Sequence, residues 1–383
     1  MRVGTPGFVA QRLTEAREAR GLAQTALSEL TGIKSQSISH YEQGRQSPSP
    51  EALGLLCEKL GVPERYFLKP LPANDGGPVF FRSPKPHVRA ARLKAERRLG
   101  WLKEIAGYLR RHVDLPAAAV PDLPVGVSAD AAEIENVAGT CRQRFRLGSG
   151  PLAGVVPMLE NLGCIVSRCP AGCESEGACS HWDDGMPCIL LSDDCASRIR
   201  FDAAHELGHL VMHRGFAADA LADAETHRVL EQQADRFARA FLMPARAFGR
   251  EVWAPTVDAL LALKKEWNCP VGAMITRCGE IGAFDADQVR RAQVNLSRRG
   301  GKPGESEADR GQTEEPRLLA RGIRLLIDAG VKDRHGFLTD LSFNAGDIEQ
   351  LTGLPAGYFS ECEAPPAAVL RLREVAVERD SGI

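Results

Sequence analysis

The stretch AAHELGHLVMH constrains the fold of this chain more than any other part of the sequence, because it places polar residues within an apolar run. On a helix, His205 and His209 lie four residues apart, one turn from each other on the same face. Their apolar neighbours predict that this helix, expected over Phe201–His213, is buried. Buried imidazole and carboxylate groups need partners, and a metal ion supplies them. The stretch therefore predicts a buried, metal-binding helix.

The spacing His205-Glu206-x-x-His209 is typical of zinc sites that carry out hydrolysis. Two imidazoles reach one Zn²⁺ ion, while Glu206 lies beside a water molecule on that ion. Zinc lowers the pKa of this water, and Glu206 can accept its proton, so that hydroxide attacks a carbonyl group that the metal polarises. Glu206 is thus the expected catalytic residue and Zn²⁺ the expected cofactor.

A zinc site of this kind needs a third protein ligand, and the sequence offers several. His213 lies one turn further along the same helix, but ligands stacked along one helix drift apart by about 6 Å per turn. Glu231, on a second helix expected over Leu230–Leu242, serves better, and Asp235 on the same face is expected to accept a hydrogen bond from a ligand histidine. The rivals in the intervening loop are Asp219, Asp223, Glu225 and His227.

The sequence HELGHLVMH, followed by the pattern ExxADxFAxxFLMP, resembles the ImmA/IrrE family of zinc metallopeptidases, which are related in layout to gluzincins. The resemblance covers about residues 130–250 and implies an α+β domain with a small sheet. It also implies cleavage of a protein substrate, typically a repressor, in stress responses or mobile-element control. By this resemblance His205, His209 and Glu231 are the metal ligands and Glu206 is the general base. Relatives often carry an Asp-Gly-Phe-Ser-like segment where this chain has CPAGCESEGACSHW, which leaves the substrate contacts near this loop open.

That loop contains three cysteines and a histidine, Cys169, Cys173, Cys179 and His181. Their spacing lacks the CxxC pairs of common structural zinc sites. Three interpretations remain: reduced thiols without a function, a second zinc site, or a redox switch in which a loop thiolate blocks the open zinc position until it is oxidised.

The first 70 residues predict five short helices, several of them ended by glycine. Within them, a helix, a turn and a second helix over residues 24–43 fit a helix-turn-helix. The sequence from Gly21 to Val62 resembles the lambda-repressor-like, XRE-type family, which implies binding to a double-stranded DNA operator as a homodimer. The alternative is a helical bundle used for protein contacts. By the resemblance, phosphates would be held by Gln24 and Arg45, and the major groove would be read by Ser35, Gln36, Ser39 and His40.

The remaining sequence completes a multidomain, mainly α fold. The segments CIVSR and PCILLS predict two strands of the central sheet. Residues 71–113 hold ten lysines and arginines against three acidic residues, and predict a basic helix that either attracts phosphates or forms a solvated face. The expected divisions are the DNA-binding domain at 1–70, a basic linker helix at 71–127, the metallopeptidase domain at 128–250, a helical extension at 251–300, a flexible linker at 301–316 and a helical C-terminal region at 317–383.

Composition narrows the location and leaves three functions open. The sequence has no apolar run long enough for a membrane span and no secretory signal, so a cytoplasmic protein with reduced cysteines is expected. The first function is a DNA-binding regulator whose zinc endopeptidase cleaves a repressor or the chain itself. The second is a transcription factor that uses the metal for sensing or stability, and the third is an antitoxin-like autoregulator.

Overall fold

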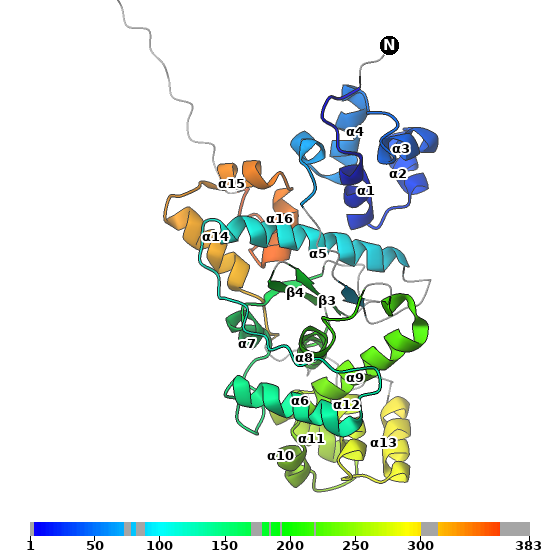
Figure 1. Ribbon diagram of the computed structural model, residues 1–383, viewed down its shortest axis with the longest axis vertical. Helices are drawn as coiled ribbons and strands as arrows, with labels where there is room; N and C mark the ends of the chain where they lie inside the picture. Colours follow the sequence, from blue (N-terminus) through cyan, green and yellow to red (C-terminus); the bar gives the residue numbers. More distant parts are fainter. Residues whose placement is uncertain are drawn as a thin grey trace, which may run out of the picture.

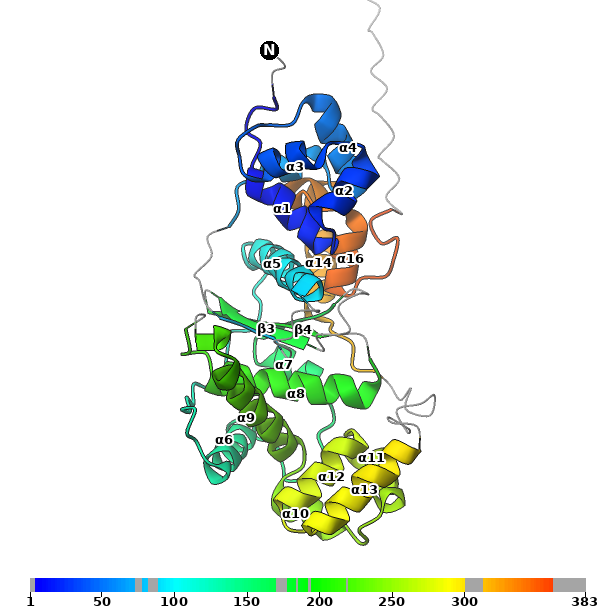
Figure 2. The same ribbon diagram turned by 90° about the vertical axis from the view of Figure 1, so that its right-hand side faces the viewer.

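The computed structural model describes residues 4–72, 78–81, 89–169, 178–183, 185–191, 194–217, 220–299 and 313–360. These residues are mostly helical and are stacked along one long axis (Figures 1 and 2). The N-terminal helices lie at one end, a small sheet lies in the middle, and helices α10–α13 lie at the other end. None of the helices in the described ranges combines the length and apolar character that a membrane span requires.

The N-terminal bundle has the expected order of short elements. The Ser49 hydroxyl accepts a hydrogen bond from the Ala52 amide, and Pro50 follows in the first turn, so that both residues favour the start of α4. Gly61 ends that helix with a φ of 61°, in the left-handed region that suits glycine. The expected fifth helix is a short 3₁₀ helix instead. The elements are α1 (Ala10–Ala19), α2 (Gln24–Thr31), α3 (Ser35–Glu42), α4 (Pro50–Leu60) and η1 (Glu64–Leu68).

The central sheet has four strands in the order β1-β3-β4-β2. Strands β2 and β4 are parallel and correspond to the two predicted strands, whereas β3 pairs antiparallel with both β4 and β1. The other two strands were not predicted from the sequence: β3 lies at the end of the cysteine-containing loop, and β1 in the segment before the basic helix. The strands are β1 (Val79–Phe81), β2 (Ile165–Arg168), β3 (Ala178–Asp183) and β4 (Met186–Leu191).

The two faces of this sheet contribute to different cores, because successive side chains of a strand point to opposite faces. One face packs against α5 (Arg89–Arg110), together with the N-terminal bundle and the C-terminal helices. The other face packs against α8 (Ala196–Met212) and the helices beyond it. The sheet therefore lies between the N-terminal bundle and the helix with the two histidines (Figure 2).

The helices between α5 and the C-terminal helices include the two expected around the histidines and Glu231, with differences at their ends. Helix α8 begins five residues earlier than predicted, and α9 begins six earlier because Asp223 caps it through the Thr226 amide. The helices are α6 (Ala131–Arg144), α7 (Val156–Asn161), η3 (Ala220–Ala222), α9 (Ala224–Leu242), α10 (Ala245–Glu251), α11 (Val257–Trp267), α12 (Val271–Glu280) and α13 (Ala286–Arg298).

The C-terminal helices join the N-terminal bundle to the rest of the molecule. Asp347 forms ion pairs with Arg20, which follows the last residue of α1, and with Arg98 of α5, both at 2.6 Å. The Ser167 hydroxyl on β2 donates a hydrogen bond to the carbonyl of Leu351. These helices are α14 (Leu318–Asp328), α15 (Arg334–Leu341) and α16 (Ala345–Thr352), whereas residues 361–383 of the expected helical C-terminal region lie outside the described residues.

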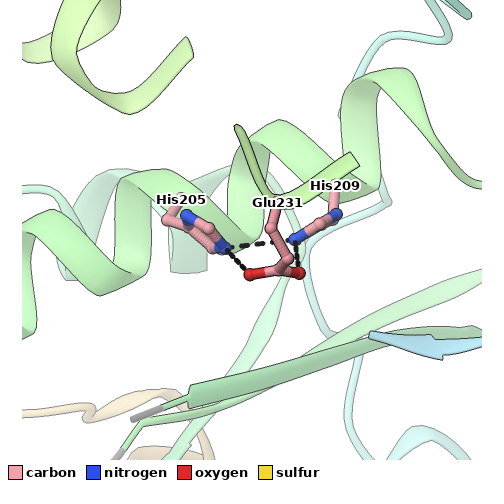
Figure 3. A group of neighbouring side chains, drawn as sticks. All are labelled: His205, His209 and Glu231. Atoms are coloured by element: carbon pink, nitrogen blue, oxygen red, sulfur yellow. Dashed lines mark hydrogen bonds and ion pairs between the residues drawn. The ribbon is translucent and has the colours of Figure 1, made fainter. Parts of the chain in front are cut away.

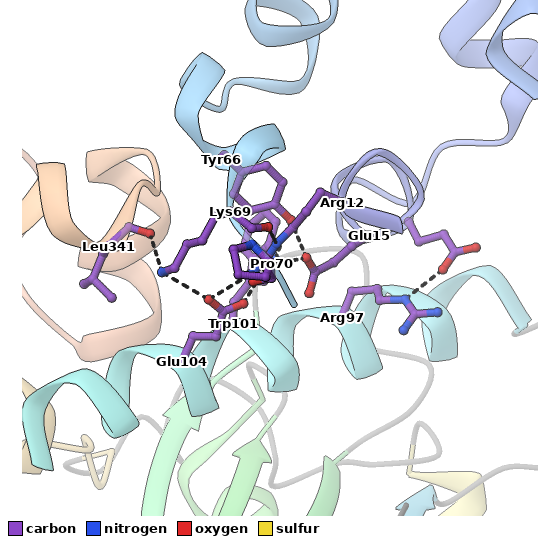
Figure 4. A network of polar contacts seen from close by, with 10 residues as sticks. Arg12, Glu15, Tyr66, Lys69, Pro70, Arg97, Trp101, Glu104 and Leu341 are labelled. Atoms are coloured by element: carbon purple, nitrogen blue, oxygen red, sulfur yellow. Dashed lines mark hydrogen bonds and ion pairs between the residues drawn. The ribbon is translucent and has the colours of Figure 1, made fainter. Parts of the chain in front are cut away.

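Helix α5 is a central core helix and not an exposed linker. Trp101 is fully buried and donates a hydrogen bond to the Tyr66 hydroxyl of the bundle. Arg12 of α1 binds Glu104 of α5, and Lys69 donates a hydrogen bond to the carbonyl of Leu341 (Figure 4). Part of the basic charge of this segment is therefore used inside the protein rather than presented to phosphates, as the salt bridges Arg97–Glu18 and Arg98–Asp347 also show.

The segment expected as a flexible linker is anchored at its end. Glu314 accepts hydrogen bonds from the backbone amides of Val155 and Val156, at 2.6 and 2.7 Å, and forms an ion pair with Arg200 of α8. Residues 301–312 of that linker lie outside the described ranges. The C-terminal helices thus enter the fold from a fixed point beside α7 and α8.

Candidate functional site

Helix α8 runs through the interior beneath the sheet, and every residue from Arg200 to Met212 is buried. His205, Glu206 and His209 are each only 1% exposed. Ionisable groups at this depth need specific partners. The second helix, α9, crosses close to α8 and supplies them.

Three side chains from these two helices converge on one point (Figure 3). The Nε2 atoms of His205 and His209 lie 3.1 Å apart. The Glu231 carboxylate lies 3.3 Å from Nε2 of His205 and 3.1 Å from Nε2 of His209. Zinc bonds of about 2.0–2.1 Å in a tetrahedral site hold ligand atoms roughly 3.3 Å apart. Two imidazoles and one carboxylate at these separations are therefore suited to a zinc ion.

A glycine allows α9 to come this close. A Cβ atom on Gly208 would lie 3.0 Å from Cδ1 of Phe237 and 3.4 Å from Cα of Ala234. Both of these residues belong to α9, on the same helix as Glu231. Gly208 is therefore the residue in the HELGH sequence that permits the helix contact on which the position of Glu231 depends.

Each histidine is oriented through its second ring nitrogen. Asp235 lies 2.9 Å from Nδ1 of His205, whereas Nδ1 of His209 contacts Nδ1 of His213 at 2.9 Å. The Gln233 amide group donates to the Gly126 carbonyl, so its oxygen accepts from Nε2–H of His213. His213 then accepts from Nδ1–H of His209. This series of hydrogen bonds leaves the lone pair of His209 Nε2 directed at the cluster formed by His205, His209 and Glu231, as a metal ligand requires.

The charges of the cluster follow from burial and proximity. Burial alone would raise the pKa of Glu231, but the two imidazoles hold it well below its usual value. Burial lowers the pKa of His205, yet Glu231 and Asp235 outweigh this effect and raise it to about 10. Burial keeps the pKa of His213 well below its usual value, so that this residue stays neutral. A ligand histidine must be neutral, so a bound metal ion would take the place of the His205 proton.

The rival ligands do not join this group in the described structure. Nε2 of His227 lies 2.8 Å from the carbonyl oxygen of Phe81. Asp223 caps α9, and Glu225 pairs with the exposed Arg228. Asp219 lies outside the described residues. His213, which the sequence also offered, supports His209 instead.

The cysteine-containing loop does not form a second cluster among its described residues. Cys169 and Cys179 are buried in the core on the α5 face of the sheet, on the opposite side from the cluster of His205, His209 and Glu231. His181 alternates with Ser180 on β3, and its Nδ1 atom contacts the Pro78 carbonyl at 2.9 Å. Cys173 lies outside the described ranges. The position of Cys169 and Cys179 argues against either thiol reaching the open zinc position.

The residues proposed to read DNA lie on or beside α3, away from α5 (Figure 1). Gln36 and Arg45 are exposed, and Ser39 and His40 are half-buried. The Gln24 amide donates to Glu42 at 2.7 Å, and Glu42 also binds Arg17. This arrangement fixes Gln24 at the start of α2. Ser35 is the first residue of α3.

One neighbour of the cluster was not found from the sequence. The ring of Phe80, on β1, stacks on His209 with 4.6 Å between ring centroids and an interplanar angle of 14°. Phe80 also pairs with Ser180 across β1 and β3. Its only signal in the sequence is the three-residue apolar run Val79–Phe81, which is too short for a strand prediction.

Comparison with known proteins assigns families to two parts of the chain. Residues 13–67 match the helix-turn-helix family, and residues 159–278 match the IrrE N-terminal-like domain, a peptidase family. A search of curated proteins gave no match. The first region contains α2 and α3, and the second contains all the residues of the cluster. The chain is therefore a fusion of an XRE-type helix-turn-helix domain with an IrrE/ImmA-like domain of the peptidase family.

Proposed function

We propose that this DNA-binding regulator is also a zinc-dependent endopeptidase, which cleaves a repressor or the chain itself in a stress or mobile-element response. The observation that carries the proposal is the convergence of His205, His209 and Glu231 from two helices, with Glu206 buried beside them. These three residues would hold the ion and leave a fourth position open. When bound, zinc supplies a Lewis acid that polarises a peptide carbonyl and acidifies water.

Glu206 is suited to move the proton in this reaction. Its Oε2 atom is buried and has no hydrogen-bond partner among the described residues. Burial raises the pKa of Glu206 to about 7, against the lowering effect of His205. A carboxyl group with a pKa near neutrality accepts a proton from the attacking water and returns it to the leaving amine. Asp235 and His213 keep the two histidines in the orientation that this step needs.

Replacement of the proposed base tests this function. Zinc-loaded wild type, Glu206→Gln and the matched surface control Glu225→Gln are each incubated with protein extract from the source organism, and new N-termini are identified by mass spectrometry. Wild type and Glu225→Gln are expected to generate the same new termini, and Glu206→Gln none. Glu225 is a suitable control because its side chain is exposed at the start of α9.

The second candidate is a transcription factor in which the metal serves sensing or stability. Phe80 favours it, because its ring covers one face of His209. Zinc-bound wild type that produces no terminus beyond those of Glu206→Gln supports this candidate and contradicts proteolysis.

The DNA-binding domain implies a double-stranded DNA partner, and we propose a homodimer that reads its operator with α3. Gln36 is exposed there and has the amide group that pairs with adenine in the major groove. Selection of bound sequences from a random DNA library identifies the operator. Gln36→Ala should then cost about 1–3 kcal/mol of discrimination at one base pair, and uniform binding to all sequences would contradict this reading.

A further inference from the structure

Strand β1 closes an edge of the sheet beside the metal cluster. Without β1, strand β3 would be the edge strand, and β3 packs against α8. An open edge presents unpaired N–H and C=O groups, and extended peptides bind such edges by adding a strand. In this chain the added strand comes from a distant part of the sequence, between the DNA-binding bundle and α5.

The side chain of Phe80 fills a small apolar pocket next to the cluster. It is 4% exposed and packs with Leu221, Leu230 and Phe216, apart from the two large cores of the protein. The same ring stacks on His209. The pocket therefore receives one large, flat apolar side chain and places it against a proposed metal ligand.

The backbone of this segment is held at both ends by imidazole groups from other elements. His227 of α9 lies 2.8 Å from the Phe81 carbonyl oxygen, and His181 of β3 lies 2.9 Å from the Pro78 carbonyl oxygen. Both contacts are to main-chain atoms, as are those of the β1–β3 ladder. Any extended peptide in the same direction can make them, whatever its sequence.

We propose that the edge of β3 is the binding site of the substrate polypeptide and that β1 occupies it as an intramolecular competitor. The substrate is an extended segment that pairs antiparallel with β3 and places a large apolar side chain, preferably aromatic, in the pocket of Phe80. The term substrate rests on the proposed peptidase function, whereas competition for the edge is a property of binding alone. A strand of only three residues with a small apolar cluster belongs to the least stable part of a fold, which makes exchange feasible.

The test measures binding of a fluorescein-labelled synthetic peptide, Gly-Pro-Val-Phe-Phe-Arg, which corresponds to residues 77–82. Fluorescence anisotropy gives its Kd for zinc-loaded full-length protein in a Glu206→Gln background, so that the peptide is not cut. Phe80→Ala is expected to bind the peptide at least tenfold more tightly than the background protein. Val79→Ala is the matched control, because Val79 lies on the same strand and packs toward the opposite face. It should change the Kd much less than Phe80→Ala does, because the pocket of Phe80 stays filled, and a peptide with alanine in place of the residue corresponding to Phe80 should not bind.

Equal affinity of Phe80→Ala and the background protein overturns the proposal. If Phe80→Ala does not fold or bind zinc, hydrogen exchange in the unsubstituted Glu206→Gln protein decides the question. A saturating excess of peptide must then accelerate exchange of the amides at Val79–Phe81, and unchanged exchange overturns the proposal. If protein that retains Glu206 binds the peptide but does not cleave it, only the proposed peptidase function is contradicted. Failure of the edge-binding proposal and failure of the peptidase proposal are therefore distinguishable.

Discussion

Gly208→Ala tests whether the close contact between α8 and α9 positions the third metal ligand. The new Cβ atom would lie 3.0 Å from Cδ1 and 3.3 Å from Cγ of Phe237, closer than ordinary van der Waals contact. Phe237 is fully buried and stacks on Phe241, so its ring has little room to yield. We therefore expect α9 to shift away from α8 and to carry Glu231 with it.

The magnitude follows from two opposing effects. Extra volume in a well-packed core costs about 1–3 kcal/mol, while alanine stabilises a helix over glycine by about 1 kcal/mol. The net loss of unfolding free energy is then ~1 kcal/mol. Gly139→Ala separates the two effects, because Gly139 is exposed on α6 and its new Cβ atom would have no neighbour within 4 Å. This control should gain the helix stabilisation alone.

Urea unfolding followed by circular dichroism gives the stabilities, and competition with a chromogenic chelator gives the zinc affinities. Gly208→Ala should be less stable than Gly139→Ala by about 1–3 kcal/mol, the full cost of the contact. Its zinc affinity should fall by about tenfold, which corresponds to ~1.4 kcal/mol, whereas Gly139→Ala should bind zinc like the wild type. Equal stability of the two variants with unchanged zinc affinity would refute the role assigned to Gly208.

Three further substitutions test the site and its connection to the rest of the fold. Asp235→Asn removes the charge that holds His205, and chelator competition should show zinc affinity weaker by roughly 10–100-fold. Glu231→Gln should weaken zinc binding more than Asp235→Asn, since it alters a proposed ligand; the reverse order would contradict that assignment. Asp347→Ala leaves Arg20 and Arg98 without their shared carboxylate, and should cost about 3–5 kcal/mol in urea unfolding. If Asp347→Ala lowers the free energy of unfolding by less than ~1 kcal/mol, the two ion pairs of Asp347 do not hold the C-terminal helices to the bundle.

Much of the helical structure follows from local signals that a single sequence contains. Ser49 and Pro50 start α4, and Gly61 ends it, because each of these residues has a specific backbone or hydrogen-bonding property. The spacing of His205 and His209 indicates their shared face for the same reason. Such features depend on neighbours within a few residues, so they can be predicted without knowledge of the tertiary fold.

Contacts between distant segments could not be predicted in this way. Helix periodicity argued against His213 as a third ligand, yet the same periodicity places it where it accepts a hydrogen bond from His209. The function of Gly208 depends on the position of Phe237 across the helix contact. The basic segment was expected at the surface, but Arg98 is buried because Asp347, 249 residues away, neutralises it. Each of these roles requires a partner that the local sequence does not specify.

The shortest strand connects the two functional regions. Phe80 points toward the metal cluster, whereas Phe81 is buried in the core that includes the DNA-binding bundle, with the guanidinium of Arg92 4.5 Å from its ring centroid. Because neighbouring residues of a strand point to opposite faces, neither ring can leave without disturbing the other. The free energy needed to withdraw β1 from the edge of β3 therefore includes the burial of Phe81 on the side of the bundle. Packing around α5 thus contributes to how readily the edge beside His209 is opened.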